Sequence, residues 1–276
     1  MKKGAAPVNC GQPLAGAGQK VKSRRSARRR QEIWLSIISP IVLLMIWEGG
    51  GRLQLMDLRY FPMPSTIAVS FWDLLLGGGL WLDFKASIIR IFWGFLLGSI
   101  PALVLGVAMG LSRFIRFTIN PIVYATYPIP KIAILPLVIL IFGLGELSKV
   151  VVVAVGAFYL VLLNTVMGVV SIDNIYFDVA KNFRTRRRDL YLRVVLPAAL
   201  PSMLTGLKLA LGVSLLLIVA AEMLGANQGI GHMIWDSWQT FTVPRMYVGL
   251  IIISALGYVL SVASDHIERE LLPWRD

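Results

Sequence analysis

The chain has 276 residues, of which 57% are hydrophobic and 15% are charged. A soluble globular domain is usually about 45–50% apolar and about 25% charged, so this composition excludes an ordinary globular domain and predicts an integral membrane protein. The formal net charge of +12 would favour a nucleic-acid partner if the protein were soluble. The positions of the 27 Lys and Arg residues along the chain therefore decide what this charge means.

A basic tail opens the chain, and residues 1–30 carry nine Lys or Arg residues and no acidic residue. The run KSRRSARRR is compatible with a nuclear-localisation or nucleic-acid patch, with part of a cleaved secretory signal, or with a transit peptide. The apolar run that follows continues into LLMIWEGGGRL without a small-residue cleavage pattern. This continuation favours an uncleaved first membrane span preceded by a disordered cytoplasmic tail over residues 1–32. The sole cysteine, Cys10, lies in this tail, so no disulfide within the chain is expected.

Six apolar runs follow, each long enough to cross about 30 Å of hydrocarbon as a helix of roughly 17–25 residues. In chain order they are Ile33–Gly50, Ala86–Leu111, Pro121–Leu144, Leu147–Val170, Leu200–Met223 and Tyr247–Ala263. The stretch FGLGELSK forms a tight polar turn that separates the third run from the fourth. The sequence therefore predicts an all-α protein with six transmembrane helices over residues 33–265, a long loop over residues 171–197 and a cytoplasmic tail over residues 266–276.

Basic residues outside these runs lie mainly on one side of the predicted topology. Nineteen of them fall in the two tails, in the SRFIRF loop and in residues 171–197. The few on the other side include Arg52, Arg59 and Arg245, and Lys149 lies at the start of the fourth run on that side. Because cytoplasmic loops carry an excess of Lys and Arg, both termini and residues 171–197 are predicted to be cytoplasmic. Topology then explains the charge, and no nucleic-acid partner is expected.

Charged residues within the runs are costly in a membrane and are therefore candidates for function. They are Glu48, Arg90, Lys131, Lys208 and Glu222. Four of them favour a structural interpretation, because they lie near the ends of their runs or can reach the interface with a long side chain. Lys131 differs because Pro128, Pro130 and Pro136 surround it, and prolines free backbone carbonyls that then need other partners. This segment is either a wall or hinge of a solute pathway or a kink that serves packing. The candidate pathway residues are Pro128, Pro130, Lys131, Pro136 and Glu222.

Glycines in the second run recur on one helix face, at Gly94, Gly98, Gly106 and Gly110. Small residues at this spacing allow two helices to approach closely, either within the chain or across a dimer.

Motifs of enzymes are missing from the sequence, which contains no GxxxxGK[ST] phosphate loop, no GxSxG and no HExxH. GANQGIGH follows a predicted span and not a strand, so it is expected to be a turn and not a nucleotide site. His232 and His266 lack the spacing of metal ligands. No catalytic residue, metal site or cofactor is therefore expected on this chain. No Asp or Glu lies near the middle of a run, which also argues against a proton-driven carrier.

The loop between the fourth and fifth runs contains DVAKNFRTRRRDLYLRVVLPAALP, residues 178–201. Asp173 or Asn174 can cap a helix that starts near Ile175, and Val179 and Phe183 then share a face with Ile175. Charge alone would also be consistent with a solvated loop that only sets the topology.

This stretch resembles the cytoplasmic "EAA" loop of ATP-binding-cassette importer permeases, whose pattern is Glu-Ala-Ala, three residues, Gly, nine residues, Ile-x-Leu-Pro. Asp178, Val179 and Ala180 occupy the first triplet, with Asp178 in the place of Glu, and residues 194–197 fill the end at the required spacing without a gap. Arg184 stands at the glycine position, where a left-handed turn would cost an ordinary residue roughly 1–2 kcal/mol. Either the turn differs here or that cost is tolerated.

FPMPSTI, PIPKIAILPLVILIFGLGELSK, LPAALPSMLTGLKLALG, VAAEMLGANQGIGHMIWDS and ERELLPW also look like the permeases that import sulfonates, taurine, nitrate or bicarbonate. The resemblance implies a type I importer permease with a cytoplasmic coupling helix, paired with a second permease copy. It further implies two ATPase subunits that bind ATP and Mg²⁺, and a periplasmic or lipid-anchored solute-binding protein. The implied ATPase contacts are Ile175, Asp178, Val179, Ala180, Phe183, Arg184, Thr185 and Pro197. The alternatives are an ATP-independent carrier or channel, a membrane-bound enzyme, and a permease for a neutral heterocyclic nutrient.

Overall fold

The computed structural model describes residues 38–273, so the basic tail over residues 1–32, Cys10 and the start of the first predicted span lie outside the described residues. The chain divides into two units, Met1–Ser65 and Thr66–Asp276. In the first unit, residues 38–52 form a helix. The Glu48 carboxylate accepts hydrogen bonds from Arg52 Nε at 2.9 Å and from the Ser65 backbone N–H at 3.1 Å. These contacts give Glu48 the structural role that the sequence favours.

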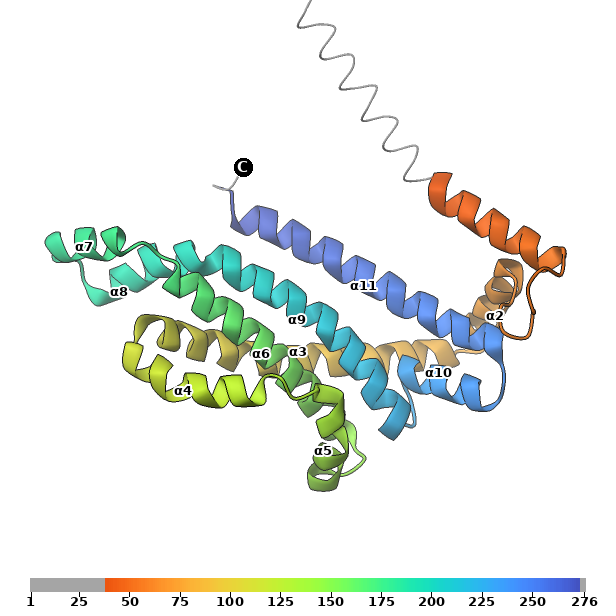
Figure 1. Cartoon of the computed structure of the whole chain (residues 1–276). Coiled ribbons are helices and arrows are strands. Elements are labelled where there is room, and N and C mark those ends of the chain that lie inside the picture. Colours follow the sequence, from red (N-terminus) through yellow and green to blue (C-terminus); the bar gives the residue numbers. More distant parts are fainter. Residues whose placement is uncertain (1–37, 274–276) are drawn as a thin grey trace, which may run out of the picture. The chain divides into compact units, whose positions relative to one another are not determined.

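Helices make up all the regular structure of the described residues from Pro64 onward (Figure 1). In chain order they are α2 (Pro64–Leu76), α3 (Gly79–Leu111), α4 (Arg113–Thr126), the 3-10 turn η1 (Lys131–Ile134), α5 (Leu135–Phe142), α6 (Glu146–Val170), α7 (Asn174–Asn182), α8 (Arg187–Leu190), the π-helical segment η2 (Tyr191–Val195), α9 (Leu196–Gly225), α10 (Ile230–Gln239) and α11 (Val243–Leu271).

Four helical stretches of the described chain are long and apolar enough to cross a membrane, and a bent helix pair makes a fifth. Together with the helix over residues 38–52, they are consistent with the six predicted spans. All four long helices extend beyond their apolar runs. α3 starts at Gly79 and so includes Asp83, and α11 continues to Leu271. Hydropathy alone could not show this, because the residues that extend the helices beyond the apolar runs are partly polar.

The third predicted span needs correction, because Pro121–Leu144 is not one continuous span. α4 ends at Thr126, and the segment Lys131–Phe142 continues at 86° to it. Proline at residues 128 and 130 removes two backbone N–H donors just after α4, so the helix cannot continue through them. Figure 1 shows α4 and α5 pointing in different directions.

The core of the second unit is a packed set in which α6 contacts both α3 and α9 (Figure 1). The glycine face of α3 lies against α6. A Cβ atom placed on Gly94 would lie 2.6 Å from Val153 Cβ, and one on Gly106 would lie 2.6 Å from Thr165 Cβ. Gly98 lies against the backbone of Ala154. Of the two possibilities left open by the sequence, the glycines therefore serve packing within the chain.

Candidate functional site

α7 and the turn after it form one end of the second unit (Figure 1). The Asp173 side chain caps the helix by accepting a hydrogen bond of 3.0 Å from the Ile175 N–H, as the sequence predicts. At the other end, the Thr185 N–H donates to the Ala180 carbonyl at 2.9 Å, and the Arg184 N–H donates to the Lys181 carbonyl at 3.0 Å. These two bonds define a Schellman motif, which requires a left-handed residue just after the helix.

Arg184 is that left-handed residue, with φ of 51°. Glycine is the usual residue here because it has no Cβ to clash with the backbone. The left-handed turn is therefore present in this chain, although Arg184 stands at the glycine position of the family pattern. The sequence left open whether the turn differs or its conformational cost is tolerated, and the structure shows that the cost is tolerated.

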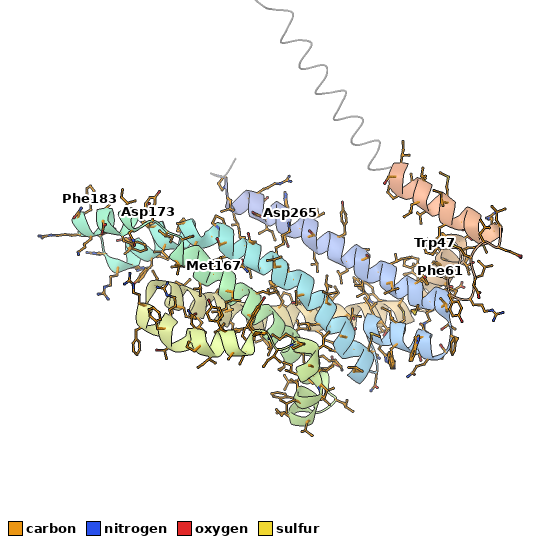
Figure 2. All side chains as sticks on the ribbon, in the orientation of Figure 1. Trp47, Phe61, Met167, Asp173, Phe183 and Asp265 are labelled. Carbon is orange, nitrogen blue, oxygen red and sulfur yellow. The ribbon has the colours of Figure 1, made fainter. Side chains whose placement is uncertain are left out.

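An uncovered apolar face is the main surface feature of α7. The exposed fractions are 60% for Ile175, 57% for Tyr176, 49% for Val179 and 80% for Phe183. Figure 2 shows Phe183 projecting at the end of the unit. The sequence did not single out Tyr176 as a contact with the ATPase, although it is adjacent to Ile175. Ala180 was predicted to be such a contact, but it is only 8% exposed, so it packs within the chain.

The remaining predicted contacts lie around the same turn. Asp178, Arg184 and Thr185 are exposed. Pro197 lines a cavity of about 630 Å³ between the start of α7 and the start of α9, together with Asp173 and Arg193. Single-turn π-helical insertions are frequent at functional sites, and η2 lies between α8, which follows this turn, and α9.

Lys131 lies at the bend between α4 and α5. Its ammonium group donates hydrogen bonds to the carbonyls of Thr126 at 3.1 Å, Tyr127 at 3.0 Å and Ile129 at 2.9 Å. It also lies 4.2 Å from the centre of the Tyr159 ring of α6. An ammonium group has three N–H donors, so these carbonyls occupy all of them. One of these carbonyls, that of Thr126, lies four residues before Pro130, which has no N–H to donate to it. Lys131 therefore links three carbonyls around the bend, and one of them is a carbonyl that a proline deprives of its helical partner.

The other residues predicted to line a solute pathway do not form one site with Lys131. Pro128 and Pro130 flank Lys131 at the bend, and Pro136 lies in the first turn of α5. Glu222 has its contacts with α3 and with the turn between α9 and α10. Lys208, which the sequence assigned to structure, pairs with Asp265 of α11. That partner was missed because the last span was expected to end at Ala263.

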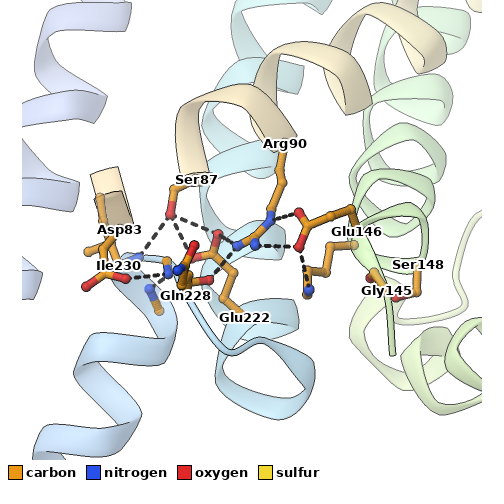
Figure 3. A network of polar contacts seen from close by, with 12 residues as sticks. Asp83, Ser87, Arg90, Gly145, Glu146, Ser148, Glu222, Gln228 and Ile230 are labelled. Atoms are coloured by element: carbon orange, nitrogen blue, oxygen red, sulfur yellow. Dashed lines mark hydrogen bonds and ion pairs between the residues drawn. The ribbon is translucent and has the colours of Figure 1, made fainter. Parts of the chain in front are cut away.

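A buried polar network surrounds Arg90 at the end of the core opposite α7 (Figure 3). Arg90 Nη1 donates to Glu222 Oε1 at 2.7 Å and to the Gln228 carbonyl at 2.7 Å. Its other edge, Nε and Nη2, faces both oxygens of Glu146, with 2.7 Å from Nη2 to Oε1. Lys149 Nζ also donates to Glu146 Oε1, at 3.2 Å. The network therefore joins α3, α6 and α9.

The turn between α9 and α10 is fixed by backbone N–H groups that donate to this network. Gly229 N–H donates to Asp83 at 2.8 Å, Ile230 N–H to Ser87 Oγ at 2.9 Å, and Gly231 N–H to Glu222 at 3.0 Å. Residues 226–229 of GANQGIGH thus form a turn, as the sequence predicts, but Ile230, Gly231 and His232 already belong to the first turn of α10, which was not predicted. Within the described residues, no group of three or more His, Cys, Asp or Glu side chains is placed to hold a metal ion.

Comparison with known proteins gives a consistent result. Residues 94–272 match the family described as "Binding-protein-dependent transport system inner membrane component". A Bacillus subtilis protein named for aliphatic sulfonate transport, SsuC, is 34% identical over 92% of this chain and 92% of its own length. The taurine transport system permease protein TauC of Escherichia coli is 30% identical over 93% of this chain and 96% of its own length. The nitrate import permease protein NrtB of Leptolyngbya laminosa is 31% identical over 86% of each chain.

The fold also has a counterpart among solved structures. A chain of the MetNI methionine ABC transporter, in an inward-facing conformation, superposes with a TM-score of 0.60 at 21% identity. The match covers 72% of this chain and 97% of that one.

Proposed function

We propose, from the premise that the chain belongs to the family of binding-protein-dependent transport system inner membrane components, that it carries a small anionic solute across the bacterial inner membrane. As a member of this family it is the membrane-spanning permease subunit of an ATP-driven importer, and ATP hydrolysis belongs to a separate subunit. The solute class follows the relatives named for sulfonate, taurine and nitrate transport; bicarbonate is chemically similar. Both termini and α7 would face the cytoplasm, since nineteen of the basic residues outside the spans lie on that side.

The proposed assembly contains two copies of this chain, two ATPase subunits and one solute-binding protein on the outer side. ATP and Mg²⁺ would bind the ATPase subunits. On this chain, α7 would dock into the ATPase through Ile175, Tyr176, Val179 and Phe183. The uncovered apolar face of α7 is the observation that carries this assignment, because an exposed patch of apolar side chains at a water-facing end marks a protein contact.

Movement of α7 would reach the membrane helices through its two covalent connections. Residues 171–173 lead directly back into α6, and the Arg184 turn leads through α8 and η2 into α9. Since α6 packs on both α3 and α9, a pull on α7 would move these three helices as one body. Pro128, Pro130, Lys131 and Pro136 are proposed to shape a wall of the solute pathway at the bend.

The substitution Phe183→Asp tests the docking face. A carboxylate at this position would have to be desolvated in the interface, and loss of a central interface side chain costs about 2 kcal/mol or more. We expect the ATPase to bind the purified permease more than about tenfold more weakly, and solute-stimulated ATPase activity to be abolished. Membrane insertion should be unchanged.

Phe241→Asp is the matched control. Phe241 is 82% exposed, as Phe183 is at 80%, but it lies in the turn between α10 and α11 at the other end of the unit. The ATPase should remain bound to this variant. Equal retention of the ATPase by both variants would show that α7 is not the docking element. Solute uptake that persists without ATP would exclude an ATP-driven importer.

A further inference from the structure

Two buried cations share one exposed carboxylate at the end of the core opposite α7. The side chains of Arg90 and Lys149 are each 4% exposed, whereas the side chain of Glu146 is 66% exposed. Glu146 is thus an accessible anion held by two cations that water barely reaches. Figure 3 shows Arg90 between Glu146 and Glu222.

The two carboxylates of the network are held very differently. Glu222 is fully buried and accepts from Arg90, from Ser87 Oγ and from the Gly231 N–H. Removing it from these partners would leave charges buried without compensation, which is strongly unfavourable. Glu146 accepts from Arg90 and Lys149, and its release would transfer an already exposed side chain to water. Of the two carboxylates, Glu146 is therefore the one that another anion can replace.

The N–H donors that Glu146 would leave free, on Arg90 and Lys149, are complementary to the oxygens of a small oxyanion. Arg90 Nε and Nη2 form a planar pair of donors, which suits two oxygens of one carboxylate, sulfonate, nitrate or bicarbonate group. Lys149 Nζ adds a third donor on the same side. Without Glu146, the Nε and Nη2 groups of Arg90 and the Lys149 ammonium lose the carboxylate that they share, and a small oxyanion would supply acceptor oxygens and a negative charge in its place.

We propose that Arg90 and Lys149 form a binding site for a small monovalent oxyanion, and that the Glu146 carboxylate occupies this site until the anion displaces it. The identification of that anion with the transported solute rests on the proposed function, whereas the existence of the site does not. The site lies where α6 begins and α9 ends, which is the outer end in the proposed topology.

Glu146→Ala tests the proposal in the full-length chain, purified in detergent without the ATPase. The variant should unfold at a lower temperature than the wild type, and methanesulfonate, acetate or nitrate should raise that temperature in a saturable manner at constant ionic strength. Ligand that binds only the folded state stabilises it in proportion to the logarithm of its concentration above Kd. The wild type should respond at least tenfold more weakly, because its tethered carboxylate competes at high effective concentration.

The double variant Glu146→Ala with Lys149→Met supplies the control, since it removes the third donor and one positive charge. Its apparent anion affinity should fall at least tenfold below that of Glu146→Ala. Where Glu146→Ala does not fold, Glu146→Gln gives the same comparison with the side-chain shape kept.

Three results would overturn the proposal. The first is a Glu146 variant that responds to anions no more than the wild type does. The second is a double variant that responds as strongly as the single one. The third is stabilisation by phosphatidylglycerol in mixed micelles but not by free methanesulfonate, which would identify a lipid headgroup. Because no ATPase or binding protein is present, these outcomes are independent of the docking test.

Discussion

Arg184 is one of three residues other than glycine that have a positive φ in the described part of the chain. Its φ of 51° closes the Schellman turn after α7, and a Cβ in this conformation costs roughly 1–2 kcal/mol. We expect Arg184→Gly to stabilise the turn by about 1 kcal/mol, since part of the gain is offset by the greater freedom of glycine in the unfolded chain. Hydrogen exchange of the Thr185 amide should slow by about fivefold.

Arg184→Ala separates the Cβ effect from the loss of charge. Alanine keeps the Cβ and removes the guanidinium, so exchange at Thr185 should remain close to that of the wild type. Faster exchange in the glycine variant would contradict the prediction, because it would mean that the arginine side chain itself holds the turn.

At the scale of elements, the bend between α4 and α5 depends on Lys131. Its three hydrogen bonds satisfy the carbonyls of Thr126, Tyr127 and Ile129. Lys131→Met keeps the side-chain length but supplies no donor, so the carbonyls of Tyr127 and Ile129 lose the partner that links them across the bend. We expect this variant to lose transport and to show a broadened distribution of distances between spin labels at Ile122 of α4 and Leu140 of α5.

Lys131→Arg is the control for charge and donors, and it should keep both the distance distribution and a large part of the transport. If Lys131→Met instead retains a narrow distribution while its solute preference changes, Lys131 binds solute and does not hold the bend.

The contact between α3 and α6 is the second element with a specific requirement. A Cβ on Gly98 would meet the Ala154 backbone, which cannot move aside as a flexible side chain can. Overpacking of this kind costs on the order of 1–3 kcal/mol, so Gly98→Ala should lower the thermal unfolding temperature in detergent.

Gly212 of α9 provides the comparison, because nothing lies within 4 Å of a Cβ placed there. Gly212→Ala should leave the unfolding temperature unchanged or raise it, since alanine favours a helix by about 1 kcal/mol over glycine. A similar loss of stability in both variants would mean that close packing is not the reason for the glycine at residue 98.

For the whole molecule, the sequence predicted those features that are set by residues only a few positions apart in the chain. The cap at Asp173, the face shared by Ile175, Val179 and Phe183, and the glycine stripe of α3 each follow from spacings of a few residues. The family pattern located the turn at Arg184, but only the backbone shows that the left-handed conformation is kept.

Long-range partners could not be predicted in this way. Arg90 and Glu222 are 132 residues apart, and Arg90 and Glu146 are 56 apart. Hydropathy marked Arg90 and Glu222 as unusual within spans but gave no reason to pair them. The same limit concealed Asp265, since only the continuation of α11 brings it to Lys208. The bend at Lys131 was expected as an irregularity, but its angle depends on three carbonyls and on Tyr159 of another helix.

The apolar face of α7 also has a consequence for the life of the protein in the cell. On the proposed docking of α7, a permease copy made without its ATPase would leave Ile175, Val179 and Phe183 in contact with water at the end of the bundle. Such a face resembles the exposed hydrophobic segments that chaperones and proteases act on. We therefore expect surplus permease to be degraded, so that the steady-state amount of this chain follows the supply of its ATPase, and coexpression of the two should lengthen its half-life.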